Sequence, residues 1–178
     1  MMGVFLHPEK ILDQLDLKPD MIAADFGCGG GDFVVSLAKK LEDGFVYGID
    51  IQQEPLSSLK GRLKLENINN VQLIVSDLEK EKGSTLNDNS VDLVFIVNLL
   101  FQVEDKSAII KEAKRVLRKD GLLLIIDWLP EKEIISIEGK ISKKEVQDLV
   151  EKIGGFQLDK EIDAGAYHYS LIFKKINS

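Results

Sequence analysis

The sequence predicts an α/β fold, a doubly wound and mostly parallel sheet of seven strands that ends in a C-terminal antiparallel hairpin. Short apolar runs alternate with segments of helical period, and a glycine-rich loop follows the first run. The fourth run is apolar apart from Asp92, as expected for a parallel strand that is covered on both faces. A chain of 178 residues can bury one sizeable core, so we expect a single domain over residues 1–178.

Five apolar runs predict the parallel strands, at residues 21–26, 45–49, 71–75, 91–97 and 122–126. Apolar residues recur at helical spacing after Pro8, which predicts a helix before the first strand, and again after Asp32 and around Pro55, which predicts crossover helices between strands. A further helix is expected over 104–118, which starts acidic and ends basic, in keeping with its macrodipole. Ser142 and Glu145 form a capping box for a last helix that stops at Gly154. Residues 156–162 and 167–173 then predict the hairpin.

Composition excludes several classes of protein. The apolar runs are too short to cross a bilayer and residues 1–6 do not resemble a signal peptide, so we expect a cytoplasmic protein without membrane contact. One cysteine, Cys28, and two distant histidines, His7 and His168, predict neither a disulfide nor a transition-metal site. The net charge of −7 argues against nucleic acid as a partner, and we interpret the basic clusters at 111–118 and 140–144 as solvated helix faces.

The glycine loop that follows the first strand is the predicted ligand site. Ligands of open α/β sheets bind at the carboxyl ends of the strands, where a glycine loop lets them approach the backbone and a helix N-terminus. The loop has glycines at its first, third and fifth positions, Gly27, Gly29 and Gly31. A dinucleotide fingerprint needs a glycine at the sixth position, where this chain has Asp32, a carboxylate that would repel a pyrophosphate.

Five motifs in order resemble class I S-adenosylmethionine-dependent methyltransferases, whose fold is Rossmann-like. They are the acidic residue and GxGxG at 25–31, the acidic strand end at 48–50, the acidic motif at 75–78, the fourth strand at 90–98 and the segment 117–127. The chain is similar to small bacterial methyltransferase-domain proteins near the ubiquinone-biosynthesis and arsenite methyltransferases. The lone Cys28 disfavours arsenite as the substrate. Lys119-Asp120-Gly121 stands where relatives commonly have Pro-Gly-Gly, and Asp before Gly still permits a turn.

The resemblance implies S-adenosylmethionine as the cofactor and ten residues that bind it. Asp25 would hold the amino group of the methionine part, Asp50 would accept hydrogen bonds from the ribose hydroxyls, and Asp77 would meet the adenine. Asn98 would lie below the methionine and the methyl group. Taken alone, Asp50 and Asp77 are also common strand-end residues. The ten residues are Asp25, Gly27, Cys28, Gly29, Gly31, Asp50, Ile51, Asp77, Leu78 and Asn98.

Methyl transfer from a sulfonium is an in-line displacement, which depends on alignment and on exclusion of water more than on catalytic side chains. A general base is needed only when the acceptor must lose a proton near the transition state. His168 is the candidate base, since its imidazole titrates in the useful range; Tyr167, Tyr169 and Asp127 are weaker candidates. Alternation along the hairpin places His168 on the opposite face from both tyrosines.

The predicted function is methyl transfer to a small-molecule acceptor, because the chain has almost no inserted material with which to recognise a larger one. A second subunit could enclose the acceptor, which leaves a homo-oligomer open. One alternative is a non-catalytic module that binds S-adenosylmethionine without turnover. Another is a nicotinamide-dependent oxidoreductase on a related fold, which the glycine spacing disfavours.

Overall fold

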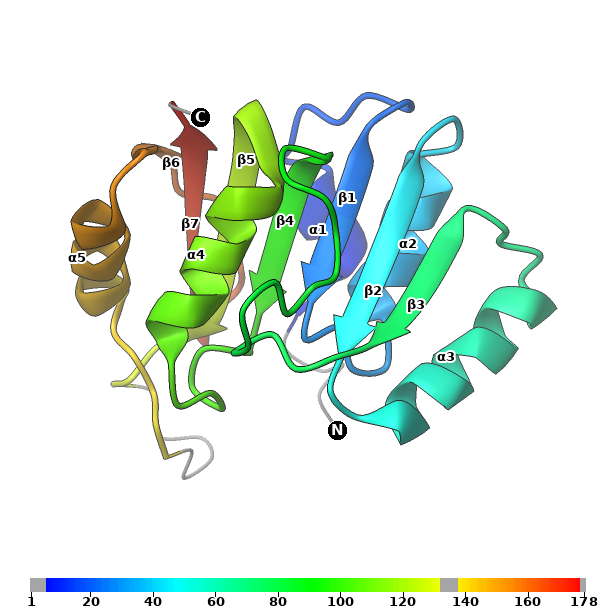
Figure 1. Cartoon of the computed structure of the whole chain (residues 1–178), viewed down its shortest axis with the longest axis horizontal. Helices are drawn as coiled ribbons and strands as arrows, with labels where there is room; N and C mark the ends of the chain where they lie inside the picture. Colours follow the sequence, from blue (N-terminus) through cyan, green and yellow to red (C-terminus); the bar gives the residue numbers. More distant parts are fainter. Residues whose placement is uncertain (1–5, 132–137, 177–178) are drawn as a thin grey trace.

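Seven strands form one sheet in the order β3-β2-β1-β4-β5-β7-β6 (Figure 1). The structure is a computed structural model that describes residues 6–131 and 138–176. The strands are β1 (Ile22–Phe26), β2 (Phe45–Asp50), β3 (Val71–Val75), β4 (Val91–Val97), β5 (Leu117–Trp128), β6 (Phe156–Lys160) and β7 (His168–Lys175).

Strands β1 to β5 pair in parallel, whereas β7 runs antiparallel to both β5 and β6. The arrow of β7 accordingly points opposite to those of β1, β2 and β4 in Figure 1. The chain passes outward from β1 to β3 and then returns to β4 on the other side of β1. The strand order thus reverses between β1 and β4, the place where open α/β sheets bind ligands. This architecture confirms the predicted fold class.

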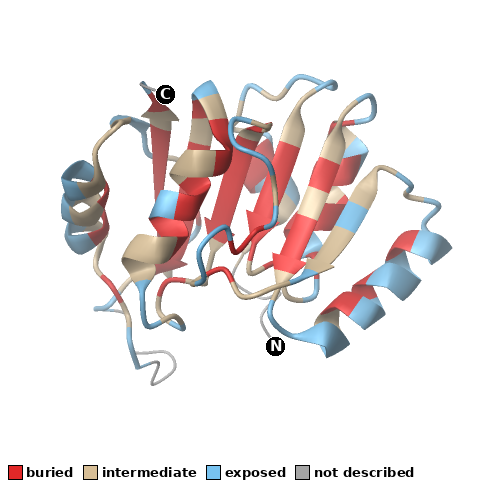
Figure 2. Cartoon of the chain, in the orientation of Figure 1, coloured by how far each residue is buried: buried red, intermediate tan, exposed pale blue. Residues whose placement is uncertain are grey.

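Helices cover both faces of the sheet. On one face, α1 (Pro8–Leu12), α2 (Asp32–Lys40) and α3 (Gln53–Leu65) contribute to one apolar cluster with the sheet. On the other, α4 (Lys106–Val116) and α5 (Lys143–Ile153) contribute to a second cluster. Figure 2 shows the central strands almost wholly buried, and Phe26 and Phe95 have no exposed surface. Burying such a side chain stabilises the fold by about 1.5–3 kcal/mol, so the central strands hold the strand ends in fixed positions.

One local expectation was wrong. Helix α4 ends at Val116 rather than at residue 118, and Leu117 begins β5 by pairing with Val91. In the strand, Leu117 is completely buried. A position at the polar end of a helix would leave this apolar side chain more exposed. The connection over residues 76–90 between β3 and β4 contains no helix.

A buried polar cluster holds that connection against α4 instead of a crossover helix. Glu112 on α4 accepts a hydrogen bond from the backbone of Ser84 at 2.9 Å and another from its hydroxyl. Arg115 donates to both carboxylate oxygens of Glu112, at 2.8 and 2.7 Å. The predicted capping box of Ser142 and Glu145 is present at the start of α5, and β6 and β7 form the predicted hairpin.

Candidate functional site

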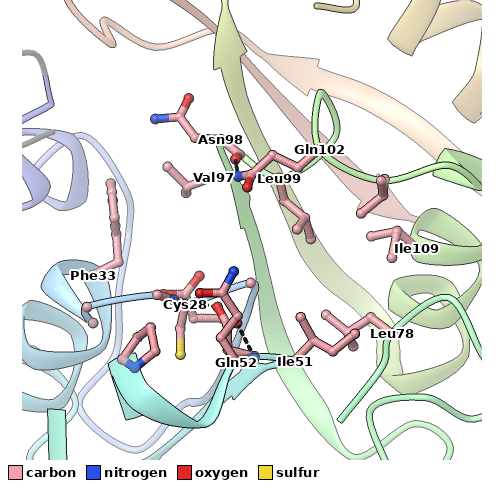
Figure 3. Close-up of a pocket in the computed structure, with 18 of the residues that line it drawn as sticks. Cys28, Phe33, Ile51, Gln52, Leu78, Val97, Asn98, Leu99, Gln102 and Ile109 are labelled. Carbon is pink, nitrogen blue, oxygen red and sulfur yellow. Dashed lines mark hydrogen bonds between the residues drawn. The ribbon is translucent and has the colours of Figure 1, made fainter. Parts of the chain in front are cut away.

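A cavity of about 640 Å³ lies at the carboxyl ends of β1, β2, β3 and β4. All ten residues predicted to bind the cofactor line it. In Figure 3, Ile51 and Leu78 lie on one side of this space, Asn98 lies well away from them, and Phe33 approaches from α2. The structure therefore brings residues from four strand ends together, as the topology predicts.

The glycine loop owes its shape to the first, third and fifth glycines. Gly27, Gly29 and Gly31 have φ angles of +73°, +49° and +76°, a region that L-residues with a side chain rarely adopt, whereas Gly30 does not. The amides of Gly27 and Cys28 both donate to the carbonyl of Ile49, at 2.8 and 3.0 Å. A Cβ atom on Gly31 would overlap the side chain of Leu59. The first, third and fifth positions, whose glycines distinguish this loop from a dinucleotide fingerprint, are thus the positions with a left-handed backbone.

Asp25, the last residue but one of β1, presents a buried carboxyl group to the cavity. Burial, followed by repulsion from Asp50, raises its pKa to about 8. Neither a hydrogen bond nor a cation among the described residues lowers that pKa. A buried carboxyl group of this kind is expected where a ligand supplies the compensating positive charge.

Asp50 ends β2 and ties the glycine loop to the next connection. Its Oδ2 accepts a hydrogen bond from the amide of Gly29 at 2.8 Å, and its Oδ1 accepts one from the amide of Gln52 at 2.9 Å. A carboxylate has about four acceptor positions, so both oxygens keep one for a ligand diol. Asp77 uses Oδ1 in the same way to accept from the amide of Glu79 at 3.0 Å.

Asn98 follows β4 directly and has a left-handed backbone with φ of +52°. Its amide donates to the carbonyl of Ile126 at 2.9 Å, and its carbonyl accepts from Nε2 of Gln102 at 2.6 Å. Its side-chain Oδ1 is buried and has no hydrogen-bond partner among the described residues. Asp127 on β5, the residue after Ile126, accepts from the amide of Trp128 through Oδ1 at 2.8 Å, and its Oδ2 is buried without a hydrogen-bond partner among the described residues.

The lone cysteine belongs to the wall of the cavity. Burial raises the pKa of the Cys28 thiol, and the carboxylates of Asp25 and Asp50 raise it further. The thiol is therefore neutral near pH 7 and a poor nucleophile. Cys28 thus acts as a small packing residue in this wall rather than as a nucleophile. Over the described parts of the chain, no three His, Cys, Asp or Glu side chains are grouped so as to hold a metal ion, and no helix is long and apolar enough to cross a membrane.

His168 does not line the cavity. It begins β7, is 4% exposed, and packs its ring 4.1 Å from the ring of Trp128. Burial lowers its pKa to about 4, so the imidazole is a weak base at neutral pH. Tyr169 lies on the other face, as predicted, where its hydroxyl donates to the carbonyl of Ile141 at 3.0 Å. The geometry argues against His168 as a general base.

Several lining residues were absent from the sequence prediction. Leu6 and Pro8 come from the distant N-terminal segment, and Phe33 had the spacing of an ordinary core position on α2. Other lining residues could have been predicted from the sequence, because they adjoin a predicted residue or follow one within a few positions. These are Gln52, Ser76, Glu79, Val97, Leu99, Gln102 and Val103.

Sheet order and cavity together define the class of the protein. A parallel sheet with one reversed strand, β7, and a glycine loop between β1 and α2 is the Rossmann-like methyltransferase architecture. The chain belongs to the methyltransferase-domain family, whose model matches residues 17–168.

Individual relatives agree with this family. A SAM-dependent methyltransferase from Aquifex aeolicus superposes with a TM-score of 0.86 at 27% identity, over 97% of this chain and 91% of that one. Demethylmenaquinone methyltransferase from Staphylococcus saprophyticus is 29% identical over 67% of this chain and 49% of its own length. The enzyme of that name from Bacillus mycoides is 31% identical over 64% of this chain and 47% of its own length. The chain thus spans about half the length of these curated relatives.

Proposed function

We propose that this chain transfers the methyl group of S-adenosylmethionine to a small-molecule acceptor by in-line displacement. The family and the similarity to the SAM-dependent enzyme from Aquifex aeolicus support the cofactor. The observation that carries the proposal is the buried Asp25 carboxyl group, which faces the cavity without a cationic or hydrogen-bonding partner among the described residues.

The residues present fit this cofactor. Asp25 offers a carboxylate to an ammonium group, and Asp50 keeps one acceptor position on each oxygen for two ribose hydroxyls. The side chain of Ile51 is 63% exposed and offers an apolar face to the adenine ring. Asp77 and Leu78 border the same part of the cavity. Bound S-adenosylmethionine would supply a methyl group activated by its sulfonium.

The chain would contribute alignment and exclusion of water. With the cofactor held by Asp25 and Asp50, its methyl group would pass to the acceptor's nucleophilic atom, the electron pair of the broken sulfur–carbon bond would stay on sulfur, and the proton displaced from the acceptor would pass to solvent. Because positive charge is dispersed in this step, holding the reacting atoms in line is the main requirement, and the rigid turn at Asn98 is the part of the wall suited to do so.

The proposal is tested by two measurements on the purified chain. We expect calorimetry to show binding of S-adenosylmethionine, and incubation with a panel of small metabolites to release S-adenosylhomocysteine. Tight binding without release from any metabolite would favour the non-catalytic module. Binding of NAD in place of S-adenosylmethionine would contradict the proposal altogether. The cytoplasmic location and a homo-oligomer stay predictions.

The contacts of Asp50 change how it should be tested. Asp50→Ala would remove the acceptor for the Gly29 amide as well as the proposed ribose contact. Asp50→Asn keeps one side-chain oxygen for the loop and loses the charge. We expect Asp50→Asn to weaken the binding of S-adenosylhomocysteine about tenfold, a loss of about 1.4 kcal/mol, with little change in unfolding. Unchanged affinity in calorimetry would remove Asp50 from the site.

A further inference from the structure

The charges that line the cavity are all of one sign. Its charged residues over the described parts of the chain are five carboxylic acids, and no Lys, Arg or His side chain borders it there. The acids are Asp25, Asp32, Asp50, Asp77 and Glu79. Two of these acids are ion-paired with residues outside the lining, Asp32 with Arg62 at 2.8 Å and Asp77 with Lys80 at 3.7 Å. An anionic group in the part of the cavity not used by the cofactor would lose its hydration without gaining a cationic partner among the lining residues.

The part of the wall not used by the proposed cofactor is mostly apolar. If Asp50, Asp77 and Asp25 hold the nucleoside and the ammonium group, the remaining wall includes Leu6 and Pro8 near α1, Phe33 from α2, and Val97. Figure 3 shows Phe33 and Asn98 apart from Ile51 and Leu78. This end is therefore where a methyl acceptor would bind.

A single polar atom at that end needs a partner. Oδ1 of Asn98 is buried without a hydrogen bond from any described residue, although the backbone of Asn98 is fixed by Ile126 and Gln102. A carbonyl oxygen can only accept hydrogen bonds. An unsatisfied buried acceptor favours a ligand that carries an O–H or N–H group, and disfavours an otherwise similar ligand that lacks one.

We infer that the methyl acceptor is an uncharged, largely apolar molecule whose hydroxyl or amino group donates a hydrogen bond to Oδ1 of Asn98, and that phosphate- or carboxylate-bearing acceptors are rejected. The inference rests on the proposed function and deepens it. The hydrogen bond holds the nucleophilic oxygen or nitrogen beside the methyl group, and an apolar wall without a cationic side chain sets the charge selectivity.

Three compounds on one aromatic skeleton test this inference. Calorimetry would measure para-ethylphenol, para-hydroxyphenylacetate and para-ethylanisole against the chain saturated with S-adenosylhomocysteine. We expect the phenol to bind at least about tenfold more tightly than the carboxylate, because the carboxylate would lose its hydration against an apolar wall that offers no cation. We expect the anisole, which lacks the O–H donor, to bind about tenfold more weakly than the phenol.

The variant Asn98→Gly removes the amide while suiting the left-handed backbone, and it should abolish the preference for the phenol over the anisole. Asn67→Gly makes the same change at another left-handed and exposed asparagine, with φ of +55°, and should leave the preference intact. Carboxylate binding as tight as that of the phenol would overturn the inference. So would an unchanged preference in Asn98→Gly, or no binding of either neutral compound at millimolar concentration. Failure of S-adenosylhomocysteine itself to bind would instead overturn the proposed function.

Discussion

At the scale of single residues, Asp25 links ligand binding to pH. Its pKa is about 8 because its carboxyl group is buried and Asp50 is near, so it is mostly protonated at pH 7. An ammonium group requires the ionised form, which means that binding releases a proton below pH 8. We expect the affinity for S-adenosylhomocysteine to rise by up to about tenfold per pH unit up to pH 8 and then level off. Calorimetry in buffers of different ionisation enthalpy measures both the affinity and the number of protons released on binding.

Asp25→Asn provides the control for this coupling. It should bind weakly and with no pH dependence over the same range. In the free protein, the folded state holds the Asp25 proton more tightly than the unfolded state, whose pKa is near 3.8. The contribution of Asp25 to stability is thus present below that value and lost as the pH rises through 8. Asp25→Asn should therefore be more stable than the parent at pH 8, on the order of 5 kcal/mol from the shift between 3.8 and about 8; a less stable variant would contradict the buried carboxyl group.

His168 has the opposite pH dependence. Its folded pKa of about 4 lies below the ordinary value of 6.5, so the unfolded state binds more protons between these values. The parent protein should lose stability as the pH falls from 6.5 toward 4. His168→Phe preserves a ring against Trp128 and should resist acid better, as urea unfolding at neutral and acidic pH would show. Its methyl transfer should stay within about twofold of the parent. Loss of turnover with cofactor affinity intact would restore His168 as a base.

At the scale of elements, the buried cluster around Glu112 replaces a helix between β3 and β4. Glu112→Ala would leave the guanidinium of Arg115 with Asp88 as its remaining carboxylate partner, and the amide of Ser84 without its buried acceptor. Because Arg115 keeps one partner, we expect a loss of roughly 2 kcal/mol in urea unfolding, less than the cost of about 3–5 kcal/mol for a fully unpaired buried charge. The same connection carries Asp77, and S-adenosylhomocysteine should bind several-fold more weakly.

Lys144→Ala provides the comparison for that variant. It removes an exposed ion pair with Asp148 and should leave both unfolding and binding essentially unchanged, because exposed pairs contribute little. A Glu112→Ala protein as stable as Lys144→Ala would mean that the cluster does not anchor the connection.

The elements that sequence analysis predicted well are those specified by neighbouring residues. The parallel strands were predicted from short apolar runs. The glycine loop was predicted from three glycines at positions whose positive φ angles favour glycine. The boundary between α4 and β5 was missed because Leu117 suits a helix or a strand equally, and its pairing with Val91 is a long-range contact. The acceptor wall was missed for the same reason, since Leu6 joins it from a remote part of the chain. The cofactor roles and the single-domain boundary at 1–178 stay predictions.

At the scale of the whole molecule, the cavity is assembled by four strand ends and the N-terminal segment, so unfolding of the sheet destroys it. A ligand that binds only the folded state stabilises it by about 2.7 kcal/mol when present at a hundredfold excess over Kd. For a chain of this length that corresponds to a rise in Tm of roughly 5–10 °C.

We expect S-adenosylhomocysteine to produce that rise in a thermal unfolding scan, and NAD at equal concentration to produce none, because Asp32 stands where a pyrophosphate would approach the loop. Asp50→Asn should need about tenfold more S-adenosylhomocysteine for the same rise, which shows that the effect comes from this site. A comparable rise with NAD alone would assign the cavity to a nicotinamide cofactor, since both ligands carry an adenosine and only the groups beyond the ribose differ in their fit to the glycine loop.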